Sequence, residues 1–172
     1  MPFVNRSDAG KQLAGELLQY KAGQPVILAL PRGGVPVAAE IAAALGAPLD
    51  LLLVRKIGAP MQPELAMGAV VDGANPVVVR NDDVVRLLGV SDKEFQAVCD
   101  AEMAEIERRR KRYFGNRQPI DVEDRVAIIV DDGIATGATI RAGLQATRHR
   151  KPQRLVLAAP VAPPDTLDAL RG

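Results

Sequence analysis

The sequence predicts an α/β fold in which a parallel sheet lies between two layers of helices. Short, continuously apolar runs are typical of strands that are buried on both faces of a parallel sheet. Turns rich in glycine or proline follow these runs and lead into helical periodicity, so that strand, helix and strand follow closely in a βαβ unit. The pattern is that of a three-layer, Rossmann-like sheet. The apolar runs are Pro25–Leu30, Leu49–Val54, Arg125–Val130 and Arg154–Pro160.

Composition places the chain among ordinary globular proteins. Hydrophobic residues make up 48% of the 172 residues and charged residues 25%, which favours one domain with a sizeable core. Lys and Arg number 22 and Asp and Glu 21, so the charge balance gives no reason to expect a nucleic acid or a membrane as partner. Cys99 is the sole cysteine, which leaves no internal disulfide. We therefore predict a cytoplasmic location and a buried thiol.

The first and last parts of the chain carry the helices of the predicted parallel sheet. An amphipathic helix is expected over Ser7–Tyr20 with Ser7 as its cap, and a second over Val37–Gly46 that ends on Gly46. A third helix is expected from about Ala138 to His149, and a last one begins within residues 163–172.

The middle of the chain departs from this alternation. Two apolar runs surround Asp72-Gly73, a turn signal that predicts a β-hairpin. A long helix is expected from Ser91 to about Tyr113, because Ser91 and Glu94 form a capping-box pattern. We therefore predict a single domain over residues 1–172 in which residues 66–114 form an insertion. The apolar stripe of the long helix is Phe95, Cys99, Met103 and Ile106.

The stretch VAIIVDDGIATGAT, residues 126–139, carries the strongest chemical signal. Asp131 and Asp132 stand at the carboxyl end of a predicted strand, where ligands bind in parallel α/β sheets. The small residues that follow let backbone N–H groups close around an anion at a helix N-terminus. Carboxylates beside a phosphate site suit a ligand that has hydroxyl groups or a bound cation next to its phosphate, such as a ribose 5-phosphate.

Two better-known phosphate loops do not fit this stretch. The Walker pattern needs four residues between its glycines and then a lysine, whereas three separate Gly133 from Gly137 and Ala138 stands at the lysine position. The dinucleotide fingerprint GxGxxG is absent from this turn.

At these residues the chain resembles the type I phosphoribosyltransferase family, whose signature is an aliphatic strand, two acidic residues and a small-residue loop with Thr-Gly and Thr or Ser. The resemblance implies that Asp131 and Asp132 bind the ribose hydroxyls of phosphoribosyl pyrophosphate, and that Ala135–Thr139 cradles its 5-phosphate. The whole ribose 5-phosphate site implied is Asp131, Asp132, Gly133, Ile134, Ala135, Thr136, Gly137, Ala138 and Thr139.

The resemblance extends to a pyrophosphate site. The family carries a pyrophosphate loop after its first core strand, and Arg32, Gly33 and Gly34 occupy that place. Its next strand commonly ends in a basic pair, matched by Arg55 and Lys56, and a mobile loop follows, for which residues 58–68 are the candidate. A plain tight turn remains the alternative for Gly33 and Gly34, and ordinary charges at a strand end remain the alternative for Arg55 and Lys56.

The reaction that the resemblance implies is the displacement of pyrophosphate from C1 of the ribose by a nitrogenous base or a similar small-molecule acceptor. Mg²⁺ is the implied cofactor, which Asp131 and Asp132 would hold indirectly through the ribose hydroxyls. The same two carboxylates are the candidate catalytic groups, because they would stabilise positive charge on the ribosyl group. A homodimer is left open.

One position departs from a branch of the family. Transferases of 6-oxopurines place a further Asp where this chain has Ala135, so the loop speaks against a hypoxanthine or guanine acceptor. Two other functions stay open: a phosphoribosyl pyrophosphate sensor that regulates a partner or RNA, and a plain nucleotide monophosphate binder. The sensor would use the basic runs 108–112 and 148–151 if they lie on one face, whereas solvated helix ends are the simpler interpretation.

Overall fold

The computed structural model describes residues 4–72, 76–115, 117–133, 138–162 and 164–170. Its internal contacts divide the chain into two compact units. The core unit comprises Met1–Leu52 and Ile120–Gly172, and the inserted unit comprises Leu53–Pro119. The predicted insertion, residues 66–114, lies within the inserted unit.

The core unit holds a four-stranded parallel sheet in the order β2-β1-β6-β7. Both central strands are buried at every position, which is why their sequences are continuously apolar. The sheet confirms the predicted parallel α/β architecture. Its strands are β1 (Val26–Ala29), β2 (Leu49–Leu51), β6 (Val126–Val130) and β7 (Arg154–Ala158).

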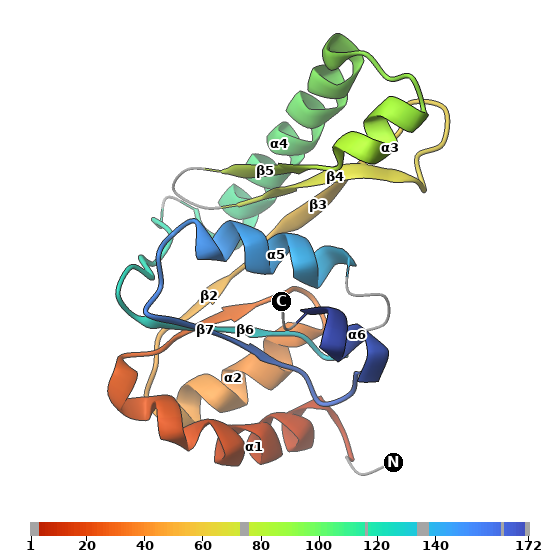
Figure 1. Ribbon diagram of the computed structural model, residues 1–172. Helices are drawn as coiled ribbons and strands as arrows, with labels where there is room; N and C mark the ends of the chain where they lie inside the picture. Colours follow the sequence, from red (N-terminus) through yellow and green to blue (C-terminus); the bar gives the residue numbers. More distant parts are fainter. Residues whose placement is uncertain (1–3, 73–75, 116, 134–137, 163, 171–172) are drawn as a thin grey trace. The chain divides into compact units, whose positions relative to one another are not determined.

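Helices cover both faces of this sheet, as Figure 1 shows: α1 and α2 pack together on one face, and α5 lies on the other. The predicted three layers are therefore present. The helix α2 ends at Gly46, which adopts the left-handed conformation (φ 61°) as expected for a glycine cap. The helices of the core unit are α1 (Arg6–Leu17), α2 (Gly34–Leu45), α5 (Ala138–Arg148) and α6 (Pro164–Leu170).

Helix α1 begins one residue earlier than predicted. Asn5 is the cap, because its side-chain oxygen accepts a hydrogen bond from the N–H of Asp8 at 2.8 Å. The predicted cap, Ser7, lies inside the helix and donates its hydroxyl to Glu40 of α2. The helix ends at Leu17, and a 3-10 helix, Leu18–Gly23, replaces its predicted last turn.

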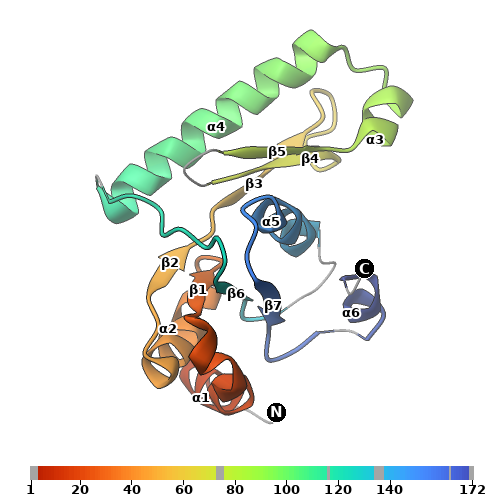
Figure 2. The ribbon, with the colours of Figure 1, turned by 60° about the vertical axis from the view of Figure 1, so that its left-hand side comes forward.

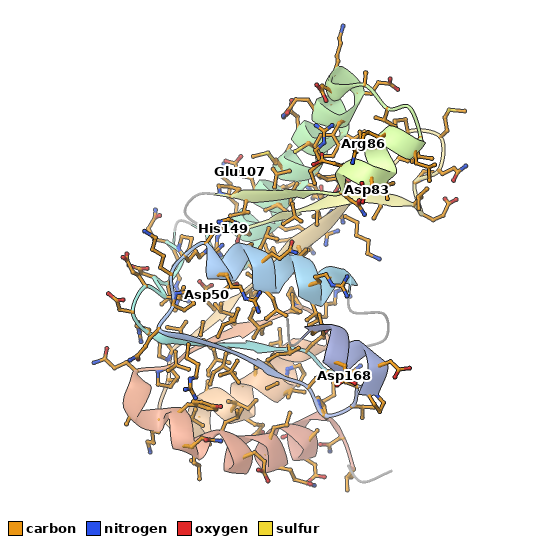
Figure 3. All side chains as sticks on the ribbon, viewed as in Figure 1. Asp50, Asp83, Arg86, Glu107, His149 and Asp168 are labelled. Atoms are coloured by element: carbon orange, nitrogen blue, oxygen red, sulfur yellow. The ribbon has the colours of Figure 1, made fainter. Side chains whose placement is uncertain are left out.

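The predicted strand Leu49–Val54 is wrong in its second half. Strand β2 ends at Leu51, and Val54 already belongs to the inserted unit. The hydrogen bonds of Asp50 explain how a carboxylate is accommodated in β2: it is buried, and its two oxygens accept the N–H groups of Leu51 (2.8 Å) and Ile120 (3.0 Å). Asp50 (Figure 3) thus joins β2 to the point where the chain re-enters the core unit.

The inserted unit is built on a three-stranded antiparallel sheet in the order β3-β4-β5. The predicted hairpin is β4 and β5, although residues 73–75 of its turn lie outside the described residues. Strand β3 and the short helix α3 were not predicted. The elements are β3 (Val54–Gly58), β4 (Ala66–Val71), β5 (Val77–Arg80), α3 (Asp82–Leu87) and α4 (Asp92–Phe114).

Helix α4 confirms the predicted long helix and packs on β3 and β4 of its unit (Figure 2). The predicted capping box is present: Ser91 Oγ accepts the N–H of Glu94 at 3.1 Å, and Glu94 Oε1 accepts the N–H of Ser91 at 3.3 Å. The predicted stripe faces the core of the unit, with Cys99 buried, and burial raises the pKa of its thiol. Within the described ranges, no helix is both long and apolar enough to cross a bilayer.

Candidate functional site

The predicted acidic pair stands at the carboxyl end of β6, and the predicted glycine turn stands at the carboxyl end of β1. These two strands are parallel neighbours in register, with Ala29 opposite Val130, so the segments that follow them meet at one edge of the sheet. The sequence places the two segments about 100 residues apart, and the fold brings them together. This edge is where a parallel α/β sheet binds ligands.

Glycine is required in the turn because the acidic segment packs against it. A Cβ on Gly33 would lie less than 3.0 Å from the carboxylate of Asp132, and one on Gly34 would lie 2.5 Å from the carbonyl oxygen of Val130. From the sequence, these glycines are expected to allow the approach of a ligand. The structure adds a second reason, which is the close packing of one turn on the other. The peptide bond between Pro31 and Arg32 at the start of this turn is cis.

Asp131 is held firmly in an environment that disfavours its charge. Its N–H donates to the carbonyl of Ala158 at the end of β7 (3.2 Å), and its Oδ1 accepts the N–H of Asp132 (2.8 Å). Burial, together with the neighbouring Asp132 carboxylate, raises the pKa of Asp131 to about 6 and outweighs the opposing backbone hydrogen bond. Near pH 6 this group is therefore divided between its acid and carboxylate forms.

Asp132 has a cationic partner that the sequence analysis did not identify. Arg6, at the start of α1, places its Nε 3.0 Å and its Nη2 2.9 Å from Asp132 Oδ2. The side chains of Arg6 and Asp132 are 61% and 31% exposed, so this ion pair is open to solvent. No local pattern could have revealed it, because 126 positions separate the two residues.

The predicted phosphate cradle is only partly described. Residues 134–137, which include the predicted site residues Ile134, Ala135, Thr136 and Gly137, lie outside the described residues. Around them, Gly133 and Thr139 are part-buried, and α5 begins at Ala138. The helix start agrees with the prediction, and the anion argument rests on the dipole of such a helix N-terminus.

The predicted pyrophosphate residues fall into both units. Arg32 is exposed in the turn of the core unit. Arg55 and Lys56 were predicted to end a strand of the parallel sheet, and this is wrong: they lie inside β3 of the inserted unit. The chain leaves the parallel sheet at Leu52, and β3 pairs with β4. Arg55 already has a partner: its Nε lies 2.6 Å from Glu102 Oε2 of α4. Lys56 is exposed.

The donor chemistry suits a divalent cation that is shared with a ligand. Among the residues that the structure describes, no group of three or more His, Cys, Asp or Glu side chains could hold a metal ion unaided. Asp131 and Asp132 offer hard carboxylate oxygens, and Mg²⁺ in proteins usually takes one or two of these together with water and phosphate oxygens. These residues therefore fit a Mg²⁺ ion that is shared with a ligand, whether the carboxylates hold it directly or, as the resemblance implies, through the ribose hydroxyls.

Comparison with known proteins agrees with this geometry. The chain matches the phosphoribosyl transferase domain over residues 5–171. The chain belongs to the phosphoribosyl transferase family. Two curated relatives from strains of Mycobacterium tuberculosis, each named "putative phosphoribosyl transferase", are 48% identical over 170 residues, which is 99% of this chain. The chain spans only 38% of the length of each of these relatives.

Solved structures place this phosphoribosyl transferase chain within the same fold. The protein TT1426 of Thermus thermophilus superposes with a TM-score of 0.82 at 38% identity, covering 98% of this chain and 79% of that one. A purine phosphoribosyltransferase of Pyrococcus horikoshii has a TM-score of 0.52 at 19% identity, covering 91% of this chain and 71% of that one. The second likeness concerns the fold alone.

Proposed function

We propose that this protein binds phosphoribosyl pyrophosphate with Mg²⁺ and transfers its phosphoribosyl group to a nitrogenous base or a similar small-molecule acceptor, with release of pyrophosphate. The observation that carries the proposal is the meeting of the Asp131-Asp132 pair with the Gly33-Gly34 turn at the carboxyl edge of the sheet. The family membership supplies the class of reaction, and the acid pair supplies a reason to expect a ligand that carries hydroxyl groups.

In this proposal each segment of the edge has one task. Asp131 and Asp132 accept hydrogen bonds from the ribose hydroxyls, and residues 135–139 bind the 5-phosphate at the N-terminus of α5. Arg32 and the N–H groups of the glycine turn bind the pyrophosphate. The two carboxylates would also stabilise positive charge that develops on the ribosyl group, which is electrostatic rather than nucleophilic catalysis.

Mg²⁺, when bound with the substrate, would neutralise charge on the departing pyrophosphate. Asp131 and Asp132 would hold it through the ribose hydroxyls. A hypoxanthine or guanine acceptor is disfavoured by the Ala135 position in the sequence, and the acceptor is otherwise open. A cytoplasmic location and a homodimer stay predictions.

Ion pairs within the inserted unit make the RNA-binding alternative less favourable. Arg108 and Arg109 of α4 both bind Glu105, and this lowers the pKa of Glu105 to about 2. Arg110 pairs with Asp72 at 2.9 Å, and Lys111 lies 3.7 Å from Glu107. Much of the charge of the basic run is therefore balanced inside its own unit, which reduces its attraction for a phosphate backbone.

Titration calorimetry with phosphoribosyl pyrophosphate, with and without Mg²⁺, tests the proposal. We expect binding that requires Mg²⁺ and that weakens at least about tenfold in an Asp131→Asn/Asp132→Asn variant, because two charge-assisted hydrogen bonds are lost. The matched control is Asp82→Asn/Asp83→Asn, an adjacent pair of exposed aspartates on α3 of the inserted unit. It should bind as the wild type does.

Three results would contradict the proposal: no binding, equal binding by the acid-pair variant, or equal affinity for a plain nucleoside monophosphate. The last result would favour the monophosphate binder. If binding is found, a screen of nitrogenous acceptors for pyrophosphate release follows. Asp132→Asn should lower turnover strongly while it changes the free energy of unfolding little. Unchanged turnover in this variant would exclude a role of Asp132 in charge stabilisation.

A further inference from the structure

The ion pair between Arg6 and Asp132 joins the start of the chain to the candidate site. Both contacts of the guanidinium go to Oδ2 of Asp132. Oδ2 is therefore occupied by the ion pair, and Oδ1 lies outside it.

The backbone around Arg6 is fixed by contacts on both sides. Asn5 caps α1 through the N–H of Asp8, and Ser7 donates its hydroxyl to Glu40 of α2. Helix α1 also packs tightly on α2, because a Cβ on Gly10 would lie 2.7 Å from the carbonyl oxygen of Val37. The guanidinium therefore reaches Asp132 from an anchored first turn and not from a free chain end.

The contact between Arg6 and Asp132 has an electrostatic effect on the acidic pair. Asp131 and Asp132 are adjacent carboxylates, and their charges repel each other. The Arg6 guanidinium on Oδ2 of Asp132 reduces that repulsion. It also restricts the side-chain rotamer, so that less conformational entropy is lost when a ligand binds.

We propose that Arg6 is a positioning residue of the candidate site, which orients the Asp132 carboxylate through Oδ2 so that Oδ1 receives a ribose hydroxyl. This inference rests on the proposed function, since it needs a sugar ligand at Asp132. Arg6 acts through Asp132 and does not itself touch the reacting atoms.

Calorimetric titration with phosphoribosyl pyrophosphate and Mg²⁺ tests the inference in five variants, of which one is Asp132→Asn alone. Arg6→Gln should weaken binding about three- to fivefold, the range expected for a solvent-exposed ion pair. Arg6→Lys keeps the charge and should recover most of the affinity. Lys11→Gln removes one exposed positive charge from the same helix and should bind as the wild type does. In an Asp132→Asn background, Arg6→Gln should have no further effect.

The outcomes separate this inference from the proposed function. If Asp132→Asn binds as the wild type does, the proposed site itself is wrong. If Asp132→Asn weakens binding while Arg6→Gln does not, only the role of Arg6 is overturned. Tighter binding by Arg6→Gln would also overturn it, because Arg6 would then compete with the ligand for Asp132. Thermal unfolding of each variant checks that it folds. If Arg6→Gln does not fold, Arg6→Lys serves as the test, because it keeps the charge. Complete loss of affinity in a folded Arg6→Lys variant would overturn the inference.

Discussion

The two residues of the acidic pair are accommodated differently: Asp131 is part-buried among backbone partners, and Asp132 is exposed enough to pair with Arg6. The pair is a local motif, which is why the sequence predicted it. The partner of Asp132 could not be predicted, because residues 6 and 132 meet only through the packing of α1 on α2 and of α2 on the sheet. Short motifs are readable from sequence, whereas contacts across 126 positions are not.

The raised pKa of Asp131 predicts a stability effect with a definite sign. In the folded protein the pKa is about 6, above the value of about 4 for an unfolded aspartate, so the folded state binds more protons between these values. The contribution of Asp131 to the free energy of unfolding should therefore fall as the pH rises from about 4 to about 6. Asp131→Asn removes this loss and should stabilise the ligand-free protein at pH 7 by about 1 kcal/mol after allowance for solvent screening.

Urea unfolding at several pH values measures this effect as the difference between variant and wild type. The difference should grow from about pH 4 to about pH 6 and then level off. Glu16→Gln, at an exposed carboxylate of α1, should show no such difference. A difference for Asp131→Asn that does not change with pH would show that the folded-state pKa of Asp131 is ordinary.

At the scale of elements, the strands and helices of the core unit follow from apolar periodicity, and the errors have physical causes. The run Leu49–Val54 is apolar apart from Asp50, yet it holds β2 and the start of β3, because Val54 pairs with Val71 of β4 and not with the parallel sheet. Asn5 and Ser7 are both good caps, and the contact of Ser7 with Glu40 is not visible in the sequence. Strand β3 was not predicted, because it is defined by its antiparallel pairing with β4 and not by a local sequence pattern.

The glycine turn after β1 packs closely against the acidic segment after β6, so a larger residue in the turn should disturb both segments. Gly33→Ala places a Cβ less than 3.0 Å from the Asp132 carboxylate, so one of the two turns must shift. We expect a loss of about 1–3 kcal/mol in the free energy of unfolding and weaker binding of phosphoribosyl pyrophosphate. Both are measurable, by urea unfolding and by calorimetry.

Gly15→Ala is the matched control, because a Cβ on this α1 glycine meets nothing within 4 Å. This change should leave binding intact and should stabilise the helix by up to about 1 kcal/mol. If Gly33→Ala is as stable as Gly15→Ala and binds as the wild type does, the close approach of the two turns has no functional weight.

At the scale of the whole molecule, the predicted site residues divide between the two units: the acidic pair and the glycine turn belong to the core unit, and Arg55 and Lys56 belong to the inserted unit. Arg55 is engaged by Glu102 within its own unit, so its role in binding would require it to share that charge. The resemblance predicted the family and the α/β fold correctly. It predicted the acceptor only by exclusion, since recognition of an acceptor depends on tertiary placement and not on a short motif.

A crystal structure of the complex with phosphoribosyl pyrophosphate and Mg²⁺ tests the central claim most directly. We expect the ribose hydroxyls to contact Asp131 and Asp132, the 5-phosphate to lie at the start of α5, and the pyrophosphate to lie against the turn at Gly33 and Gly34. Binding of the sugar elsewhere, or at this edge without contact to either aspartate, would contradict the claim.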